Sequence, residues 1–233
     1  MITVVLPCYN EGELALQNTQ KVHSYLKQFG RPFELLVCDD ASSDGTTQLL
    51  QSLQLQEIKV HHYTKGPSRR ENLALTLAEG KGEVLVYMDM DLSTGLEHLE
   101  DLVGPVIRGE YDIVVGSRYQ KGASVRREFL RLFYSFFYNL TIRLLFGSSI
   151  LDHQCGFKAF RREVYLELVR EMGYDEQYSR GWFWDAELLI RAQKKKLRIL
   201  ELPVKWIRAE KSSFNFTREL KVIPYMIRLK RRL

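Results

Sequence analysis

The fold is decided by the stretch Val84-Leu85-Val86-Tyr87-Met88-Asp89-Met90-Asp91-Leu92, an apolar run that ends at two carboxylates one residue apart. An uninterrupted apolar run of this length, with polar and glycine residues on either side, predicts a strand buried on both faces of a sheet. Two carboxylates so close together repel each other unless a cation neutralises them, and Mg²⁺ and Mn²⁺ prefer such oxygen ligands. Asp89 and Asp91 are therefore candidate metal ligands, although Asp at a strand end also serves as a turn or helix-cap residue.

Further strand-like runs alternate with segments of helical periodicity over the first half of the chain. The strand-like runs lie at residues 2–9, 33–39, 58–63, 83–88 and 111–116, and the helical segments at 13–29, 44–53, 69–79 and 96–108. This alternation predicts an α/β fold of Rossmann-like type, with a mostly parallel central sheet flanked by helices. The second half is predicted to hold a long helix at 125–146, a short strand or loop at 155–160, helices at 162–172 and 185–195, a strand at 197–207, and a basic helical tail at 216–233 that Pro224 interrupts.

Composition narrows the class of protein. A chain of 233 residues can form one sizeable domain, and its net charge of +5 favours anionic partners such as phosphate ligands or acidic lipid. The three cysteines have no metal-like spacing, which predicts a reducing compartment. We expect no signal peptide, because the chain opens on a strand pattern, and no integral span, because no apolar stretch reaches roughly 20 residues.

Polar residues follow four of the predicted strands, at the edge of the sheet where open parallel sheets bind ligands. Pro7, Tyr9 and Glu11 belong to the turn after the first strand, and Asp39 and Asp40 follow the second. The acidic pair follows the fourth strand, and Gly116-Ser117-Arg118 follows the fifth. This distribution suits a nucleotide, with acceptors for base and ribose, a metal for the diphosphate and an arginine for further phosphate charge. No glycine-rich dinucleotide or P-loop motif is present, which argues against those enzyme classes.

Several of these motifs, in order, resemble those of the family-2 glycosyltransferases, which have the GT-A fold. The resemblance is carried by Val5–Glu11, by Val37–Thr46 and by Met88–Asp91. Gly116–Arg118 and the segment Asp152-His153-Gln154-Cys155-Gly156-Phe157-Lys158 narrow it to the polyprenol-phosphate (dolichyl-phosphate) glycosyltransferases, which make dolichyl-phosphate mannose or glucose. It covers about residues 1–215. It implies one GT-A domain, with a nucleotide-sugar half at 1–118 and an acceptor half at 119–215, followed by a basic amphipathic helix at 216–233.

The resemblance also implies roles for individual residues on the donor side. Pro7, Tyr9, Glu11 and Asp39 would line the nucleobase and ribose pocket, and Asp40 would lie near the ribose or diphosphate. Asp89 and Asp91 would hold Mg²⁺ or Mn²⁺, and a late basic loop with Lys211, Ser212, Ser213 and the further candidate Arg208 would close over the diphosphate. Two positions depart from the family. Ser93 replaces a frequent Gln, and Arg70-Glu71-Asn72 replaces an Arg-Asn pair, so the family's arginine cannot be equated with Arg70.

The segment 126–146 is unusually rich in bulky apolar residues, with Arg127, Arg131, Ser135, Asn139 and Arg143 recurring every four positions. This pattern fits a helix in a membrane interface whose arginines reach head-group phosphates. The alternative is a helix packed on the sheet with its polar line in solvent. The resemblance implies that Arg118, Arg131 and Ser135 hold a lipid phosphate, and the basic tail from Arg218 onward predicts a second contact with anionic lipid.

The predicted activity is an inverting hexose transfer from a nucleotide sugar, UDP-glucose or GDP-mannose, to a polyprenyl phosphate at the cytoplasmic face of a membrane. The motif at 152–158 favours UDP-glucose. A phosphate acceptor needs no general base, whereas a hydroxyl acceptor would need one, and Asp185 is the candidate unless it merely caps the following helix. Two other classes remain open: a non-catalytic nucleotide-sugar sensor at the membrane, and a nucleotidyltransferase. Nucleic-acid binding is disfavoured, because the aromatic residues lie within a helix and not on stacking strands.

Overall fold

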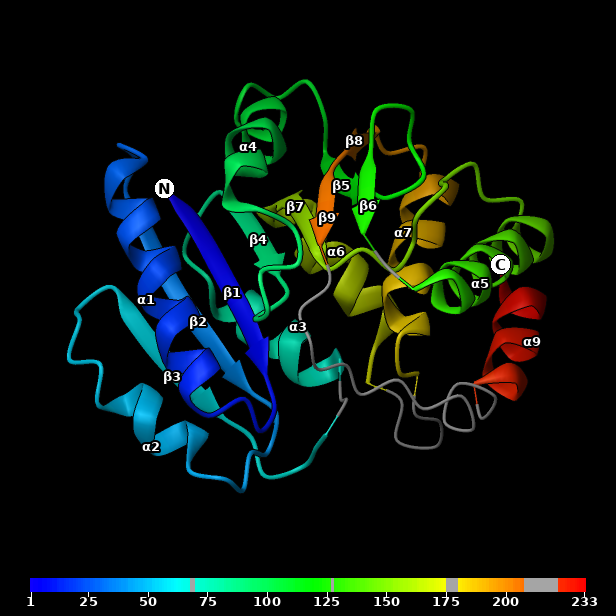
Figure 1. Cartoon of the computed structure of the whole chain (residues 1–233). Helices are drawn as coiled ribbons and strands as arrows, with labels where there is room; N and C mark the ends of the chain where they lie inside the picture. Colours follow the sequence, from blue (N-terminus) through cyan, green and yellow to red (C-terminus); the bar gives the residue numbers. More distant parts are fainter. Residues whose placement is uncertain (68–69, 127, 175–179, 208–221) are drawn as a thin grey trace.

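The computed structural model describes residues 1–67, 70–126, 128–174, 180–207 and 222–233. In these ranges the chain forms a seven-stranded sheet with helices on both faces (Figure 1). The strand order is β3-β2-β1-β4-β7-β5-β8. The strands are β1 (Ile2–Cys8), β2 (Phe33–Asp39), β3 (Ile58–His62), β4 (Val84–Met88), β5 (Ile113–Ser117), β7 (Phe157–Arg161) and β8 (Ile199–Pro203). The predicted α/β class with a mostly parallel sheet is confirmed.

One strand of the sheet runs against the others. β7 pairs antiparallel with both β4 and β5, and Phe157 lies opposite Met88. The start of β7 therefore reaches the same edge of the sheet as the carboxyl ends of its neighbours. As a result, Gly156 lies beside Asp89, and the Asp89 N–H donates to the Gly156 carbonyl at 2.8 Å.

The strands alternate their side chains between two hydrophobic clusters, one on each face of the sheet. Val4 and Leu6 of β1 pack into the first cluster, whereas Val5 packs into the second. The first cluster is covered by α1 (Glu13–Gln28), α2 (Thr46–Gln51), and α4 (Leu99–Ile107) with its leading 3₁₀ turn η1 (Leu96–His98). The second is covered by α3 (Arg70–Glu79), α6 (Arg162–Met172) and α7 (Phe183–Lys194). Burial on both faces explains why the strands read as continuous apolar runs.

A third hydrophobic cluster joins α7 to α5 (Phe129–Phe146) and α9 (Ile223–Arg232), at the right of Figure 1. Nearby, β6 (Ser124–Arg126) and β9 (Lys205–Ile207) form a small parallel sheet. The prediction that the long helix begins at Val125 is wrong, because this residue pairs with Trp206 in β6. The predicted strand 197–207 is divided into β8 and β9. Pro224 lies in the first turn of α9, where a missing N–H costs nothing, and residues 216–221 of the predicted tail lie outside the described ranges.

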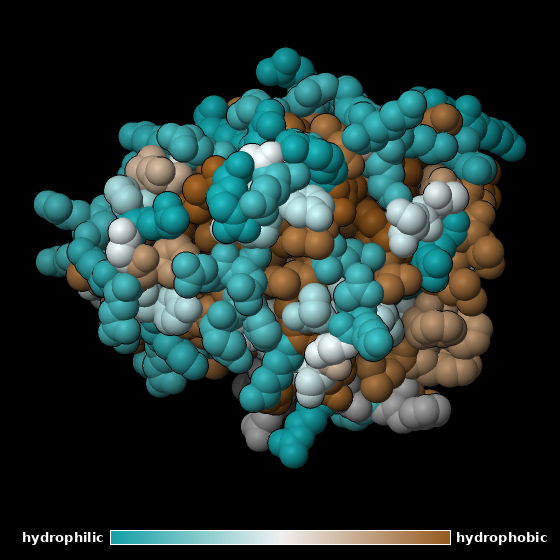
Figure 2. All heavy atoms as spheres, turned by 90° about the horizontal axis from the view of Figure 1, so that it is seen from above, coloured by the Kyte–Doolittle hydropathy of each residue, from teal (hydrophilic) through white to brown (hydrophobic). Residues whose placement is uncertain are grey.

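The polar line predicted along α5 faces the protein at its centre. Ser135 and Asn139 are buried, and Asn139 Oδ1 accepts hydrogen bonds from the N–H and ring Nδ1 of His153 at 2.8 and 2.9 Å. The alternative that places this line in solvent is therefore wrong for these two residues. The exposed side of α5 is mostly apolar instead, and Figure 2 shows hydrophobic side chains gathered on the side where Figure 1 places α5. Its large exposed apolar residues are Leu130, Phe133, Tyr134, Phe136, Phe137 and Leu144, and Thr141 and Arg143 are exposed as well.

No helix within the described ranges combines the length and the apolar character needed to cross a bilayer.

Candidate active site

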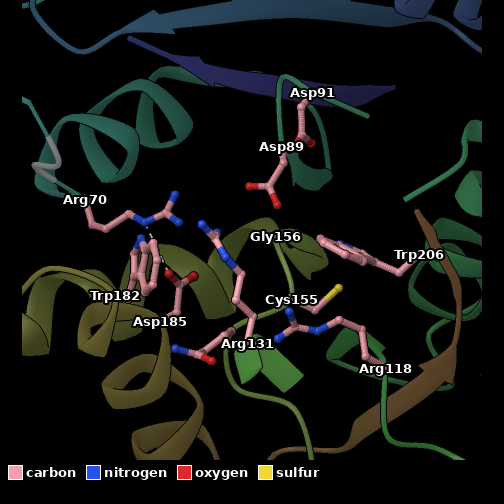
Figure 3. Close-up of a pocket in the computed structure, with 11 residues that line it drawn as sticks. Arg70, Asp89, Asp91, Arg118, Arg131, Cys155, Gly156, Trp182, Asp185 and Trp206 are labelled. Atoms are coloured by element: carbon pink, nitrogen blue, oxygen red, sulfur yellow. Dashed lines mark ion pairs between the residues drawn. The ribbon is translucent and has the colours of Figure 1, made fainter. Parts of the chain in front are cut away.

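A cavity of about 150 Å³ opens where β4, β5 and β7 meet at one edge of the sheet (Figure 3). It brings together residues from seven separate stretches of the chain. Five predicted site residues line it, namely Asp89, Asp91, Arg118, Arg131 and Asp185. The other lining residues are Arg70, Gln154, Cys155, Gly156, Trp182 and Trp206.

The acidic pair after β4 lies in the cavity wall. Burial, followed by repulsion from Asp91, raises the pKa of the Asp89 carboxyl to about 7. The Asp91 carboxylate accepts hydrogen bonds from the Ser93 N–H at 2.9 Å and the Ser93 hydroxyl at 2.7 Å. Ser93 therefore orients Asp91. An added positive charge between the two carboxylates would relieve their repulsion.

The chemistry of this pair suits a divalent cation that is shared with a ligand. Within the described residues, no group of three or more His, Cys, Asp or Glu side chains could enclose a metal ion. Mg²⁺ and similar ions commonly bind through one or two carboxylates and complete their coordination with substrate phosphate and water. Asp89 and Asp91 fit that pattern, because they offer two oxygen ligands at the mouth of a cavity lined with arginine.

Three arginines face the acidic pair, and they differ in how far their charge is already balanced. Arg118 makes a two-pronged ion pair with buried Asp152, with Nε–Oδ2 at 2.7 Å and Nη2–Oδ1 at 2.8 Å. Arg70 Nε lies 3.3 Å from Asp185 Oδ2. Arg131 Nε lies 3.3 Å from Glu128 Oε2, a side chain that is 64% exposed, so solvent weakens this pair. In Figure 3 the Arg131 side chain reaches up between Asp185 and Asp89.

Asp185 is held in a buried network beneath the cavity. Its carboxylate lies 3.3 Å from Lys158 Nζ, pairs with Arg70, and accepts a hydrogen bond from the Tyr87 hydroxyl. Burial alone would raise the pKa of the Asp185 carboxyl, but the charges of Lys158 and Arg70 and the Tyr87 hydroxyl hold it below its usual value. The carboxylate is therefore stabilised as an anion and is a weak proton acceptor.

The predicted acceptor-phosphate residues lie together. Ser135 does not line the cavity itself but lies directly behind it. Its hydroxyl accepts from Arg118 Nη2 at 3.4 Å and donates to Gln154 Oε1 at 2.9 Å. Ser135 thus links Arg118 to a lining residue, and Arg131 lies one helical turn away on α5.

The predicted nucleotide residues gather at the ends of β1 and β2, outside the lining of this cavity. The Asn10 N–H donates to Ser42 Oγ at 2.9 Å, which ties the turn carrying Pro7, Tyr9 and Glu11 to the turn after Asp39 and Asp40. The Asp39 carboxylate is fully buried, and its partners are the Ser42 N–H, the Thr47 hydroxyl and His62 Nδ1. Asp40 Oδ1 accepts from the Asn72 amide at 2.5 Å. Lys211 and its neighbours Arg208, Ser212 and Ser213 lie outside the described residues.

Sequence reasoning missed several lining residues for different reasons. Gln154 and Gly156 lie inside the quoted motif 152–158, but only the antiparallel direction of β7 brings them beside Asp89. Trp182 could have been predicted, because it precedes the candidate base Asp185 by only three residues. Trp206 could not be predicted as a site residue, because the sequence around it indicates only a strand. Arg70 was not predicted as a site residue, because its motif departs from the family's, yet it lines the cavity and pairs there with Asp185.

Comparison with known sequences agrees with this geometry. Residues 3–169 match glycosyl transferase family 2. The chain is 38% identical over 210 residues to the glycosyltransferase AglD of Haloferax volcanii, covering 88% of this chain and 33% of AglD. It is 34% identical over 215 residues to the polyprenol monophosphomannose synthase of Mycolicibacterium smegmatis, covering 89% and 77% of the two chains. It is 26% identical over 229 residues to the dolichyl-phosphate beta-glucosyltransferase of Saccharomyces cerevisiae, covering 88% and 66%. The chain thus spans one third of AglD and about two thirds of the yeast enzyme.

Solved structures share the fold. Glucosyl-3-phosphoglycerate synthase from Mycobacterium tuberculosis, in complex with UDP, aligns with a TM-score of 0.68 at 20% identity, over 99% of this chain and 80% of that one. The mannosyltransferase PcManGT from Pyrobaculum calidifontis, in complex with GDP-Man and Mn²⁺, aligns with a TM-score of 0.59 at 21% identity, over 91% and 57%. The fold is therefore the predicted GT-A fold. Because the family match also covers most of its length, the chain belongs to glycosyl transferase family 2.

Proposed function

We propose that this glycosyltransferase moves a hexose, with inversion, from UDP-glucose or GDP-mannose to a polyprenyl or dolichyl phosphate at an anionic membrane surface. The observation that carries the proposal is the cavity itself, in which an acidic pair faces three arginines while the remaining carboxylate, Asp185, is held in ion pairs. The relatives named as dolichyl-phosphate and polyprenol-phosphate enzymes support the same choice of acceptor.

On the donor side, Asp89 and Asp91 would hold Mg²⁺ or Mn²⁺. The bound ion would neutralise the departing nucleoside diphosphate. The turns that carry Pro7, Tyr9, Glu11, Asp39 and Asp40 would take the nucleoside, because they adjoin the cavity at the same sheet edge. Lys211 remains a candidate for the diphosphate on the strength of the family resemblance. Residues 1–118 would then form the donor half of the site, and residues 119–215 the acceptor half.

On the acceptor side, Arg131 would contact the lipid phosphate, with Arg118 and Ser135 behind it. Arg118 is already neutralised by Asp152, so its main contribution is a fixed guanidinium edge in the wall. A phosphate acceptor is already an anion at neutral pH. The protein therefore needs only to place its oxygen behind the anomeric carbon for a single displacement.

A hydroxyl acceptor, with Asp185 as the base, is the second candidate, because Asp185 lines the same cavity. The two candidates respond differently to substitution. We expect Arg131→Ala to lower transfer to a polyprenyl phosphate by about 10²-fold, because it removes a charge aimed at the reacting phosphate. Arg143→Ala is the matched control, since Arg143 is an exposed arginine later on the same helix.

The comparison is completed by Asp185→Asn, assayed only after its folding has been checked, because the substitution leaves Lys158 and Arg70 without their anion. Transfer to the lipid phosphate that survives Asp185→Asn but not Arg131→Ala supports the proposal. The reverse pattern, with transfer to a hydroxyl acceptor, would establish the second candidate instead.

The membrane contact would be made by the exposed apolar side of α5 together with the basic last turn of α9. That turn carries Lys230, Arg231 and Arg232, which suit anionic head groups. Arg131 belongs to α5 itself, so a lipid phosphate that it holds would lie close to the proposed membrane surface. We place this contact at the cytoplasmic face, with the protein bound peripherally.

A further inference from the structure

A second buried ion network lies behind the cavity, and no step proposed above uses it. Its centre is Arg180, which is fully buried. Arg180 Nε donates to Glu71 Oε1 at 3.0 Å, and Nη1 lies 3.4 Å from Glu187 Oε2. Nη1 and Nη2 also donate to the carbonyls of Met172 and Gly173 at the end of α6, at 3.2 and 2.5 Å. One side chain thus joins α3, α6 and α7.

Each branch of this network adjoins a residue of the cavity wall. Glu71 follows Arg70 in α3, and Glu187 lies two residues after Asp185 in α7. Arg180 itself precedes Trp182 by two residues. Because these residues are near neighbours on the same helix or turn, we expect a change in the network to displace the wall of the cavity that carries Arg70 and Trp182.

The C-terminal helix completes the network. The Tyr225 hydroxyl of α9 donates to Glu187 Oε2 at 2.7 Å, and Arg191 Nε donates to Glu187 Oε1 at 2.9 Å. The Arg180 guanidinium lies 5.8 Å from the centre of the Tyr225 ring. Among the described residues, Glu71 and Glu187 therefore balance Arg180 and Arg191, and α9 supplies the neutral donor Tyr225. A buried network of this kind holds its members in place only when each one is satisfied.

We propose that Arg180 and Tyr225 are positioning residues for the active site, so that α9 is part of the catalytic apparatus through its buried side. The network fixes the wall with Arg70 and Trp182 without touching substrate. This inference deepens the proposed function and rests on it for its effect on nucleotide binding. The effect of the network on the positions of Arg70 and Trp182 does not depend on which ligand the cavity binds.

The test uses Tyr225→Phe, which removes one hydroxyl and leaves the charges of the network balanced. Tyr111→Phe is the matched control, because Tyr111 is a partly buried tyrosine packed against the first cluster, next to the other end of β5. Two quantities are measured on the full chain of each: the dissociation constants of UDP and GDP in the presence of Mn²⁺, and the quenching of tryptophan fluorescence by acrylamide. Quenching reports mainly Trp182, since Trp184 and Trp206 are buried.

We expect Tyr225→Phe to weaken binding of the preferred nucleotide about three- to tenfold and to change the quenching, while Tyr111→Phe matches the natural chain. Arg180→Lys keeps the positive charge but removes the several N–H donors of the guanidinium. It should therefore weaken nucleotide binding and change the quenching more strongly than Tyr225→Phe. If Tyr225→Phe matches Tyr111→Phe in both measurements, the inference is wrong. If the natural chain binds neither nucleotide, the proposed function is contradicted, and the quenching alone decides the role of the network.

Discussion

Gly156 serves the active site by having no side chain. A Cβ at this position would overlap the Asp89 carboxylate, and the Gly156 carbonyl holds the Asp89 N–H at 2.8 Å. The Asp89 carboxylate would therefore have to leave its present position if residue 156 carried a methyl group. The present position of the Asp89 carboxylate therefore requires a glycine at position 156.

Replacing Gly156 with Ala should displace the Asp89 carboxylate and weaken Mn²⁺-dependent transfer by roughly 10²-fold, the cost of misplacing a reacting group by about 1 Å. The measurement is kcat as a function of Mn²⁺ concentration. Gly104→Ala is the control, because a Cβ there meets only the mobile end of the Arg108 side chain at 3.0 Å. Unchanged activity in Gly156→Ala would mean that Asp89 need not occupy its present position.

His153 makes stability depend on pH. Burial lowers the pKa of His153 to about 4 from its model-compound value of 6.5, so the folded chain resists taking up a proton that the unfolded chain accepts. Stability is therefore complete above pH 6.5 and falls as the pH is lowered toward 4, by about 3 kcal/mol in all from this group. Urea unfolding at several pH values measures the effect, and NMR titration of the imidazole identifies its source. A titration midpoint near 6.5 in the folded protein would contradict the argument.

The sequence predicts single residues well where a motif carries them. Asp89, Asp91, Arg118, Arg131 and Asp185 were all predicted, and the structure brings them into one cavity. Asp185 was proposed as a base or a helix cap, whereas the structure pairs it with Lys158 and Arg70. That pairing joins residues from three distant segments, so no local pattern could predict it.

At the scale of elements, α5 turns Ser135 and Asn139 inward and four of its aromatic side chains outward. Phe133 is 49% exposed and Phe136 is 51% exposed, which is unusual for phenylalanine on a protein surface. Clusters of this kind indicate a binding surface for apolar partners. The basic last turn of α9 nearby favours the proposed bilayer as that partner.

The double substitution Phe133→Ser and Phe136→Ser should lower binding to vesicles of phosphatidylcholine with phosphatidylserine by about tenfold or more, because two large apolar groups no longer leave water. Sedimentation with the vesicles gives the partition coefficient. Leu75→Ser is a suitable comparison, since Leu75 is 50% exposed on α3, away from this surface. Equal partitioning of all three proteins would exclude α5 from the membrane contact.

The sequence predicted long elements better than short ones. β2 and α6 have the predicted bounds, because continuous apolar runs and helical periodicity extend over their whole length. β6 was assigned to the start of the long helix and β9 was joined to β8, because three residues carry too little pattern to mark a separate strand. The antiparallel direction of β7 was also not predicted. It depends on which strands are neighbours, which is a property of the whole sheet.

At the scale of the whole molecule, the sheet gathers the ends of β1, β2, β4 and β5 at one edge, where the proposed donor and acceptor regions meet. The central claim is that Asp89 and Asp91 hold a cation which a nucleotide diphosphate shares. This claim assigns the acidic pair a role in binding, before any chemistry, and it does not depend on the identity of the sugar or the lipid.

The most direct measurement is isothermal titration of UDP and of GDP, with and without Mn²⁺, into the natural chain and into the double variant Asp89→Asn, Asp91→Asn. We predict that one nucleotide binds the natural chain at least about 10²-fold more tightly with Mn²⁺ than without it, and that the double variant loses this dependence. Tight binding of the nucleotide to the natural chain without metal, or an unchanged effect of Mn²⁺ in the double variant, would contradict the claim.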